Sequence, residues 1–60
     1  MAERIYRLSE LTALIGLGRS TIYRMMDAGE FPRPIHLTRK TVGWRSSDIS
    51  AWLEARPVAA

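Results

Sequence analysis

The feature that most constrains this chain is a short glycine-flanked link, Gly16-Leu17-Gly18, between two runs with helical periodicity. Apolar residues recur at i, i+3 and i+4 on both sides of the link, which indicates two amphipathic helices. The two stripes are Leu11, Leu14 and Ile15 before the link, and Ile22, Met25 and Met26 after it. An apolar residue inside so tight a turn packs beneath both helices and fixes the angle between them. The link therefore predicts a helix-turn-helix.

Residues that favour helix ends set the expected bounds of these two helices. Ser9 is the expected N-cap of the first helix, because its hydroxyl can accept a hydrogen bond from a free amide of the first turn. Gly16 is expected to end that helix in the left-handed conformation. Gly18 is the expected N-cap of the second helix, which should cover about residues 19–28 and end at Gly29.

The segment after the second helix cannot continue it, because Pro32 and Pro34 remove backbone donors and fix the backbone. Phe31, just before them, is expected to anchor the core. Two short runs that alternate apolar and polar residues then predict a β-hairpin with its tip at residues 38–41. The residues expected on the inner face of the hairpin are Ile35, Leu37, Val42 and Trp44. A hairpin with a basic tip beside a helix-turn-helix is a wing.

A third helix is expected after the hairpin, with an N-cap supplied by the run Ser46-Ser47-Asp48. Its apolar stripe consists of Ile49, Trp52 and Leu53. The expected fold is therefore mainly α with a small β-hairpin, a winged helix-turn-helix of three short helices plus a wing. Residues 1–60 are expected to form a single domain, ordered over about residues 5–56, with Met1 to Arg4 loosely attached.

The composition argues against several classes of function. The 60 residues include no cysteine and a single histidine, His36, so we expect no disulfide, no metal site and no cofactor. No apolar run approaches the ~20 residues of a membrane span. The sequence has neither a catalytic constellation nor a phosphate-binding glycine loop, so no motif indicates an enzyme. The expectation is a non-enzymatic protein of the cytoplasm, associated with the nucleoid.

The charged residues are unevenly placed along the chain. The net charge is +3, from nine Lys and Arg against six Asp and Glu. No acidic residue lies within residues 16–26 or within residues 31–47, although both stretches carry basic residues. A basic surface free of acids suits a phosphate-bearing partner such as duplex DNA. Chance segregation of charge in a short chain is the alternative.

The outer face of the second helix carries residue types that recognise DNA. A helix fits the major groove, where Arg reaches guanine N7 and O6 and Ser or Thr reaches several base edges. We therefore expect Ser20 and Arg24 to read bases, and Tyr23 to contact a phosphate or a thymine. Arg19 and Thr21 are better placed for phosphates, to which the first amides of the helix add. An ordinary surface helix with a solvated polar face is the alternative.

Further basic residues lie on the predicted wing. Arg39 and Lys40 at its tip are expected over the minor groove or its phosphates. Arg45, at the other end of the second β segment, is expected either to reach the DNA backbone or to brace the third helix. Trp44 and Trp52 fall on apolar stripes, so we expect them in the core rather than as stacking platforms for bases.

Two motifs are specific enough to suggest a family. They are the run Arg19-Ser20-Thr21-Ile22-Tyr23-Arg24, and the run Gly43-Trp44-Arg45 followed by Ile49 and by Trp52-Leu53. With Arg7-Leu8-Ser9-Glu10 and Gly29-Glu30-Phe31-Pro32, they resemble the AlpA family of phage and prophage regulators, which is similar to MerR-type and excisionase-type winged helices. The resemblance covers nearly the whole chain. It implies a DNA-binding regulator that either activates transcription of prophage or mobile-element genes or acts as an excision factor beside an integrase.

The leading hypothesis is a sequence-specific duplex-DNA-binding transcriptional regulator of phage, prophage or mobile-element type. The helix at about residues 19–28 would enter the major groove, and the wing at residues 38–41 would lie on the adjacent backbone or minor groove. The alternatives are an excision factor acting with an integrase, and a protein-interaction module that uses the Tyr23 face. One such domain reads only a short site, so we expect further copies on DNA. RNA polymerase or an integrase would be the protein partner.

Overall fold

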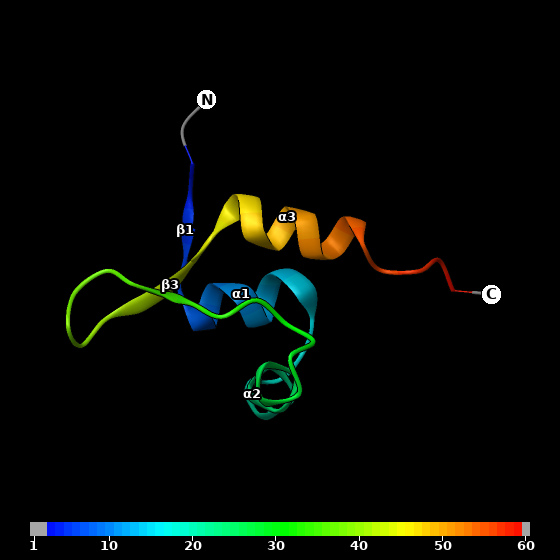
Figure 1. Ribbon diagram of the computed structural model, residues 1–60, viewed down its shortest axis with the longest axis horizontal. Coiled ribbons are helices and arrows are strands. Elements are labelled where there is room, and N and C mark those ends of the chain that lie inside the picture. The colour runs from blue at the N-terminus through cyan, green and yellow to red at the C-terminus, as the bar shows by residue number, and fades with distance from the viewer. Residues whose placement is uncertain (1–2, 60) are drawn as a thin grey trace.

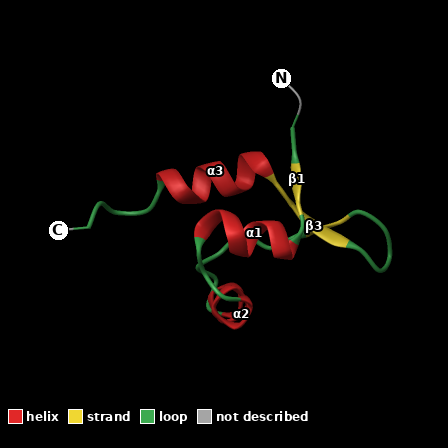
Figure 2. Cartoon of the chain, turned by 180° about the vertical axis from the view of Figure 1, so that it is seen from behind, coloured by secondary structure: helices red, strands yellow, loops and turns green. Residues whose placement is uncertain are grey.

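The structure is a computed structural model and describes residues 3–59. Within this part the chain forms three helices and a small antiparallel sheet (Figure 1). In chain order the elements are β1 (Ile5–Tyr6), α1 (Leu8–Ile15), α2 (Arg19–Asp27), β2 (Ile35–His36), β3 (Val42–Arg45) and α3 (Ser46–Glu54). Viewed from either side, α1 lies between α3 and α2, and the sheet stands at one end (Figures 1 and 2). The expected three helices with a wing are confirmed.

The link between α1 and α2 has the conformation that its glycines predict. Gly16 has a φ of 74°, and its amide donates to the Thr12 carbonyl at 2.9 Å, so α1 ends in a left-handed residue. Leu17 is half-buried and packs against the core. Gly18 is extended, and its carbonyl accepts the Ile22 amide at 3.1 Å, which makes it the N-cap of α2. The short link thus turns the chain over an apolar anchor, so that α2, seen end-on in Figure 1, runs across α1.

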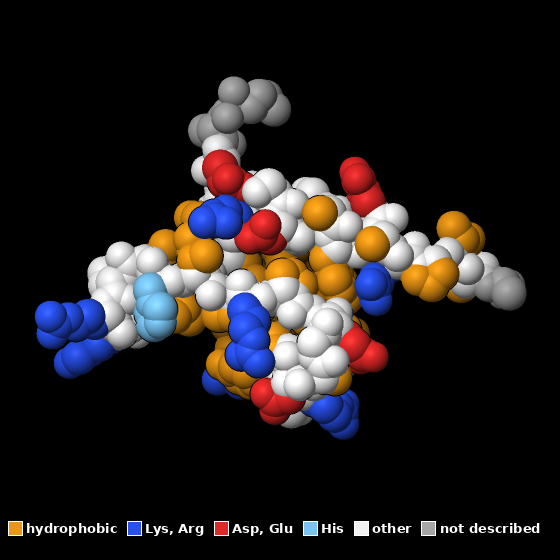
Figure 3. All heavy atoms as spheres, viewed as in Figure 1, with side chains coloured by type: hydrophobic (Ala, Val, Ile, Leu, Met, Phe, Trp, Pro, Cys, Tyr) orange, Lys and Arg blue, Asp and Glu red, His pale blue; other side chains and the backbone are white. Residues whose placement is uncertain are grey.

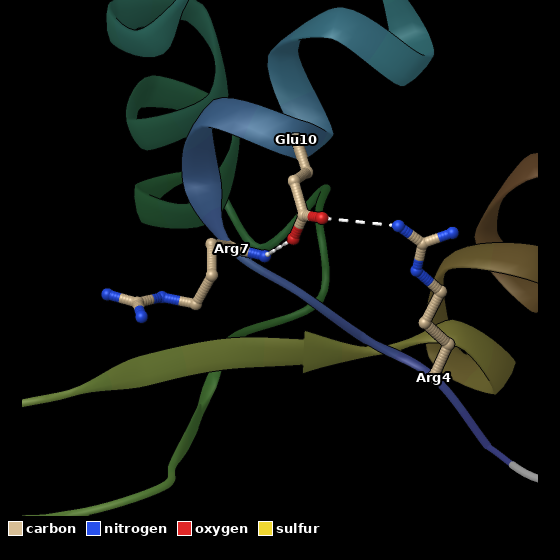
Figure 4. A network of polar contacts seen from close by, with 3 residues as sticks. All are labelled: Arg4, Arg7 and Glu10. Carbon is tan, nitrogen blue, oxygen red and sulfur yellow. Dashed lines mark hydrogen bonds and ion pairs between the residues drawn. The ribbon is translucent and has the colours of Figure 1, made fainter.

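The start of α1 differs from the prediction, because the N-cap is Arg7 and not Ser9. The Arg7 amide donates to Glu10 Oε1 at 2.9 Å, and Arg4 Nη2 donates to Glu10 Oε2 at 3.2 Å (Figure 4). A carboxylate three residues after the N-cap supplies half of a capping box and starts the helix two residues early. The Arg7 amide, and after it the Arg4 guanidinium, lower the pKa of Glu10.

α2 ends in a Schellman motif built on a glycine. Gly29 has a φ of 74°, and its amide donates to the Met26 carbonyl at 3.1 Å. The Glu30 amide donates to the Met25 carbonyl at 2.8 Å. These two bonds are the pair that defines the motif, and they satisfy carbonyls that the helix end would otherwise leave unpaired. The last helical residue is Asp27, one residue short of the expected bound.

β3 is the central strand of the sheet, whose order is β1-β3-β2. β2 and β3 form the expected hairpin, with Ile35 opposite Gly43 and His36 opposite Val42. β1 pairs antiparallel with the other edge of β3. The wing is therefore anchored to the N-terminal part of the chain, and it does not stand as an isolated hairpin.

The register corrects the predicted inner face of the hairpin. Opposite residues share a face and successive residues alternate, so Val42 and Trp44 lie on one face of the sheet. Ile35 and Leu37 lie on the other face. Trp44 is buried, whereas Leu37 is 42% exposed. A shift of one residue across the tip reverses every side chain of a strand, and alternation within each run does not fix the register between runs.

The wing tip closes without a glycine. The amides of Leu37 and Thr38 both donate to the Thr41 carbonyl, at 2.7 and 3.2 Å. The Lys40 amide donates to Thr38 Oγ1 at 3.2 Å. A threonine hydroxyl thus takes the place of a backbone acceptor in the turn. Among residues 3–59, positive φ angles occur at glycines alone, so the tip needs no left-handed residue.

The core receives side chains from all three helices and from the sheet. Its buried members are Leu11, Ile22, Met26, Phe31, Trp44 and Ile49. The Phe31 ring packs edge-on against both tryptophans, with centroid distances of 6.4 Å to Trp44 and 4.7 Å to Trp52. The two indole N–H groups donate to the carbonyls of Pro32 and Glu30, each at 2.8 Å. The expectations that Phe31 anchors the core and that Trp44 packs within it are confirmed, while Trp52 is half-buried and packs against the core.

α3 takes its cap from the N-terminal end of the chain and not from its own serines. Arg45 is the N-cap residue, and Ser46 is already helical. The Ser46 amide donates to the Arg4 carbonyl at 2.7 Å, and the Ser47 amide donates to Glu3 Oε1 at 2.9 Å. The hydrogen bonds from Ser47 lower the pKa of Glu3. Glu3 and Arg4, expected to be loosely attached, therefore hold the start of α3, while residues 1–2 lie outside the described part.

Candidate nucleic-acid interface

α2 has an inner and an outer face, and its candidate base readers lie on the outer one. Ile22 is fully buried and Met26 is 7% exposed. Ser20 and Arg24 are exposed, and Tyr23 has 48% of its surface exposed. The apolar stripe that anchors the helix therefore leaves hydrogen-bonding side chains in solvent. The structure places these three candidates on one solvent-facing surface.

The start of α2 is electrostatically open to an anion. Arg19 is its first residue and is exposed, and the first turn contains no acidic residue. Because the N-cap is Gly18, no side chain caps the free amides there. These amides carry the partial positive charge of the helix dipole. A basic side chain and unpaired donors thus meet at one end of α2.

Thr21 and Arg24 contact each other on α2. Arg24 Nη2 donates to Thr21 Oγ1 at 3.3 Å. Thr21 is half-buried, in contrast to the other candidates on this helix. Arg19 makes no side-chain hydrogen bond or ion pair within residues 3–59. The two arginines of α2 therefore differ, since one guanidinium has an intramolecular partner and the other has none.

The wing tip carries the second group of candidates. Arg39 and Lys40 are both exposed. Basic side chains cover the outer end of the wing, and no acidic side chain stands beside them in this view (Figure 3). The tip lies at one end of the molecule, and the C-terminal end of α3 lies at the other (Figure 1).

Arg45 lies apart from the wing tip, at the far end of β3 where α3 begins. Its Nη1 lies 3.7 Å from Asp48 Oδ2, three residues further on. Of the two expectations for this residue, the ion pair favours bracing of α3. The side chain is still half-exposed, at 50%, so the pair leaves donors facing solvent. The structure does not group Arg45 with the other basic candidates.

A comparison with protein families identifies the chain. The model of the family described as "Prophage CP4-57 regulatory protein (AlpA)" matches residues 4–57. The protein belongs to the AlpA family. The match includes α2, the whole wing and α3, and it confirms the resemblance seen in the sequence motifs.

Two relatives of this AlpA-family chain show how far the similarity extends. A protein of enterobacteria phage P4, described as uncharacterized protein ORF88, is 44% identical over 54 residues, covering 90% of the present chain. The chain spans 61% of the length of that phage protein. The DNA-binding transcriptional activator AlpA of Escherichia coli K12 is 34% identical over 61 residues, covering 92% of this chain and 87% of the activator.

The structure also adds a basic residue that the sequence did not single out. Arg33 is exposed, and its Nη2 donates to the Met26 carbonyl at 3.5 Å, beside the C-terminal end of α2. The acid-free stretch contained it, but a position between two prolines gave no indication of which element it would contact. In this AlpA-family protein, Arg33 therefore joins the C-terminal end of α2 to the segment that precedes β2.

Other kinds of site were sought in the part of the chain that the structure describes. No helix there is long and apolar enough to cross a membrane. Residues 3–59 bring together no group of three His, Cys, Asp or Glu side chains able to hold a metal ion.

Proposed function

We propose that this AlpA-family protein is a DNA-binding transcriptional regulator of phage or prophage type, which recognises a specific duplex sequence. The relative from Escherichia coli is named a DNA-binding transcriptional activator and matches nearly the whole chain. The observation that carries the proposal is the exposed outer face of α2, where Ser20, Tyr23 and Arg24 stand opposite a buried stripe.

α2 would enter the major groove and read base edges. The groove admits one helix, and Arg pairs with guanine while Ser bonds several bases. Ser20 and Arg24 are the proposed base readers, and Tyr23 would contact a phosphate or a thymine. Asp27, at the end of the same helix, would stay away from the backbone because its charge repels phosphate.

The start of α2 and the wing tip would position the protein on the backbone. Arg19 and the uncapped amides of the first turn offer donors and positive charge to one phosphate. Arg39 and Lys40 would contact the phosphates or the minor groove beside the helix site. Arg45 is proposed to add a backbone contact from its unpaired donors. The residues proposed to form the whole DNA interface are Arg19, Ser20, Thr21, Tyr23, Arg24, Arg39, Lys40 and Arg45.

Selection of bound sequences from a random duplex pool tests this function. A regulator enriches a defined motif, and its affinity falls with salt because counterions leave the neutralised phosphates. For about four phosphates, log affinity against log salt should have a slope of about −3.6. No enriched motif, or a slope near zero, would overturn the proposal. Arg56→Gln is the control for loss of one positive charge outside the proposed interface. This residue follows α3 and lies over the Trp52 ring, 4.8 Å from its centroid.

The partners proposed with this function are duplex DNA, further copies of the protein on DNA, and RNA polymerase. The name of the Escherichia coli relative, a transcriptional activator, favours transcription over the excision-factor alternative, in which an integrase would be the partner. A promoter reporter and an excision assay with an added integrase separate the two. Reporter activation that needs no integrase supports regulation, and excision without a reporter response contradicts it.

A further inference from the structure

The proposed base reader Arg24 is held by a neighbour on its own helix. Thr21 lies three residues earlier, and side chains on a helix lean toward its N-terminus, so the two meet on one face. Arg24 Nη2 donates to Thr21 Oγ1 at 3.3 Å. The guanidinium is thereby drawn toward the first turn of α2, the part of a recognition helix that approaches the bases.

The geometry of Thr21 suits the task of holding a neighbour. A β-branched side chain in a helix has few allowed rotamers, so its hydroxyl occupies a restricted position. Thr21 is also half-buried, which further restricts it, whereas Arg24 is exposed. A stiff acceptor beside a long flexible side chain lowers the number of conformations that the long side chain populates.

The hydrogen bond leaves enough donors for recognition. A guanidinium has five N–H groups, and one of them is engaged by Thr21. The four that remain include the pair needed for bidentate contact with guanine N7 and O6. Arg19 provides the contrast, since its side chain has no such partner within residues 3–59. A free cation suffices for a phosphate, which makes no demand on orientation.

We propose that Thr21 is a positioning residue, which presets the Arg24 guanidinium for base recognition and does not serve chiefly as a phosphate contact. The inference rests on the proposed function and assigns specificity within that site to a residue that reads no base. In solvent the bond competes with water, and at a DNA surface, where water is displaced, it strengthens. Presetting one long side chain corresponds to about a 2- to 10-fold gain in affinity for the correct base pair.

Two substitutions of Thr21 separate the effect of its hydroxyl acceptor from the effect of its side-chain shape. Thr21→Val keeps the shape of the side chain and removes the acceptor, whereas Thr21→Ser keeps the acceptor. In the free protein, nitrogen-15 relaxation of Arg24 Nε should report a lower order parameter in Thr21→Val than in the wild type. Thr21→Ser should restore most of it. The Nε of Arg19 serves as the internal control and should not respond. If Arg24 Nε is equally ordered in wild type and Thr21→Val, the proposal is wrong, whatever the DNA measurements give.

The second measurement uses the duplex motif obtained by selection and its single-base-pair variants. Thr21→Val should lower the affinity ratio between the motif and one variant by about 2- to 10-fold, at the same base pair that responds to Arg24→Ala. In an Arg24→Ala background, the same change should leave that ratio unaltered. A uniform loss of affinity for all duplexes would identify Thr21 as a phosphate contact and overturn the proposal. Absence of any motif for the wild type would instead overturn the proposed function, while the relaxation result still decides whether Thr21 orders Arg24.

Discussion

Basic side chains of equal charge stand in different surroundings on this protein. The Arg24 guanidinium is held on the outer face of α2, and Lys40 stands on a turn at the outer end of the wing. A planar fork in a fixed place can distinguish bases, whereas a flexible ammonium on a loop acts as a point charge. The two residues should therefore contribute to DNA binding in separable ways.

We expect Arg24→Ala to relax base preference at one position of the site, at a cost of about 1–3 kcal/mol for the preferred sequence. Lys40→Ala should weaken binding to every sequence alike and reduce the salt slope by about 1. The measurement is a titration of the selected duplex and a scrambled duplex at several salt concentrations. Equal losses on both duplexes for both variants would mean that Arg24 contacts a phosphate.

The ends of the helices show which local structures the sequence could predict. Gly16 and Gly29 were expected to end helices, and Gly18 to start one, because φ preference and the absence of a side chain are properties of the residue itself. The caps predicted at Ser9 and within the run Ser46-Ser47-Asp48 were wrong, because competing carboxylates and carbonyls took their places. A cap from a residue 44 positions away leaves no periodic signal in the chain.

The candidate interface follows the same division. The outer face of α2 could be read from the period of its buried stripe, since burial of one face of a helix fixes the other. Its individual contacts could not, because the Arg24 bond to Thr21 and the Arg45 pair with Asp48 depend on rotamers. Alternation within each strand likewise could not predict the register of the wing, because it does not relate one strand to the next.

The glycines at the two ends of α2 allow a matched test of backbone conformation. A Cβ added at Gly18 or at Gly29 meets no heavy atom within 4 Å, but only Gly29 has a positive φ. Gly29→Ser should lower the free energy of unfolding by about 1–2 kcal/mol, because an L-residue is strained in that conformation. Gly18→Ser should raise it by a few tenths, about 0.3 kcal/mol, because serine is a better N-cap. Urea unfolding measures both, and a loss of similar size at both positions would contradict this account of α2.

The remote cap of α3 should make stability depend on pH. Hydrogen bonds to Ser47 hold the pKa of the Glu3 carboxyl below its ordinary value of 4.5, so the folded state binds this proton less readily than the unfolded state. The stabilisation is therefore present above the unfolded pKa and is lost as pH falls through the folded pKa. We expect the urea midpoint to fall between about pH 5 and pH 3, with a smaller fall in Glu3→Gln, whose side chain does not titrate. Glu54→Gln, an exposed change on α3, is the control and should follow the wild type.

At the scale of the whole molecule, stability depends on a few buried side chains. A domain of 60 residues buries only about 60% of its unfolded surface, so its free energy of unfolding is small. The core nevertheless draws on each helix and on β3, and Trp44 connects the sheet to Phe31. Loss of one core side chain should therefore affect the entire fold and not one element.

Two leucines of α1 test this dependence under matched conditions. Leu11 is 0% exposed and Leu14 is 52% exposed. Leu11→Ala should cost about 2–5 kcal/mol, a large share of the total stability of a domain this size. Leu14→Ala should change the free energy of unfolding by less than about 0.5 kcal/mol. Circular dichroism during thermal unfolding measures both, and comparable losses would place Leu14 in a contact that the structure does not show.

The pairing of β1 with β3 has a consequence for how the protein is made. Ile5 lies opposite Arg45 in the sheet, and Glu3 binds the Ser47 amide. During translation, α1 and α2 can meet as soon as both have left the ribosome, because their contacts are local. Glu3 and β1 lack these partners until synthesis has passed Ser47. β1, which precedes all three helices in the chain, is thus among the last elements to be secured.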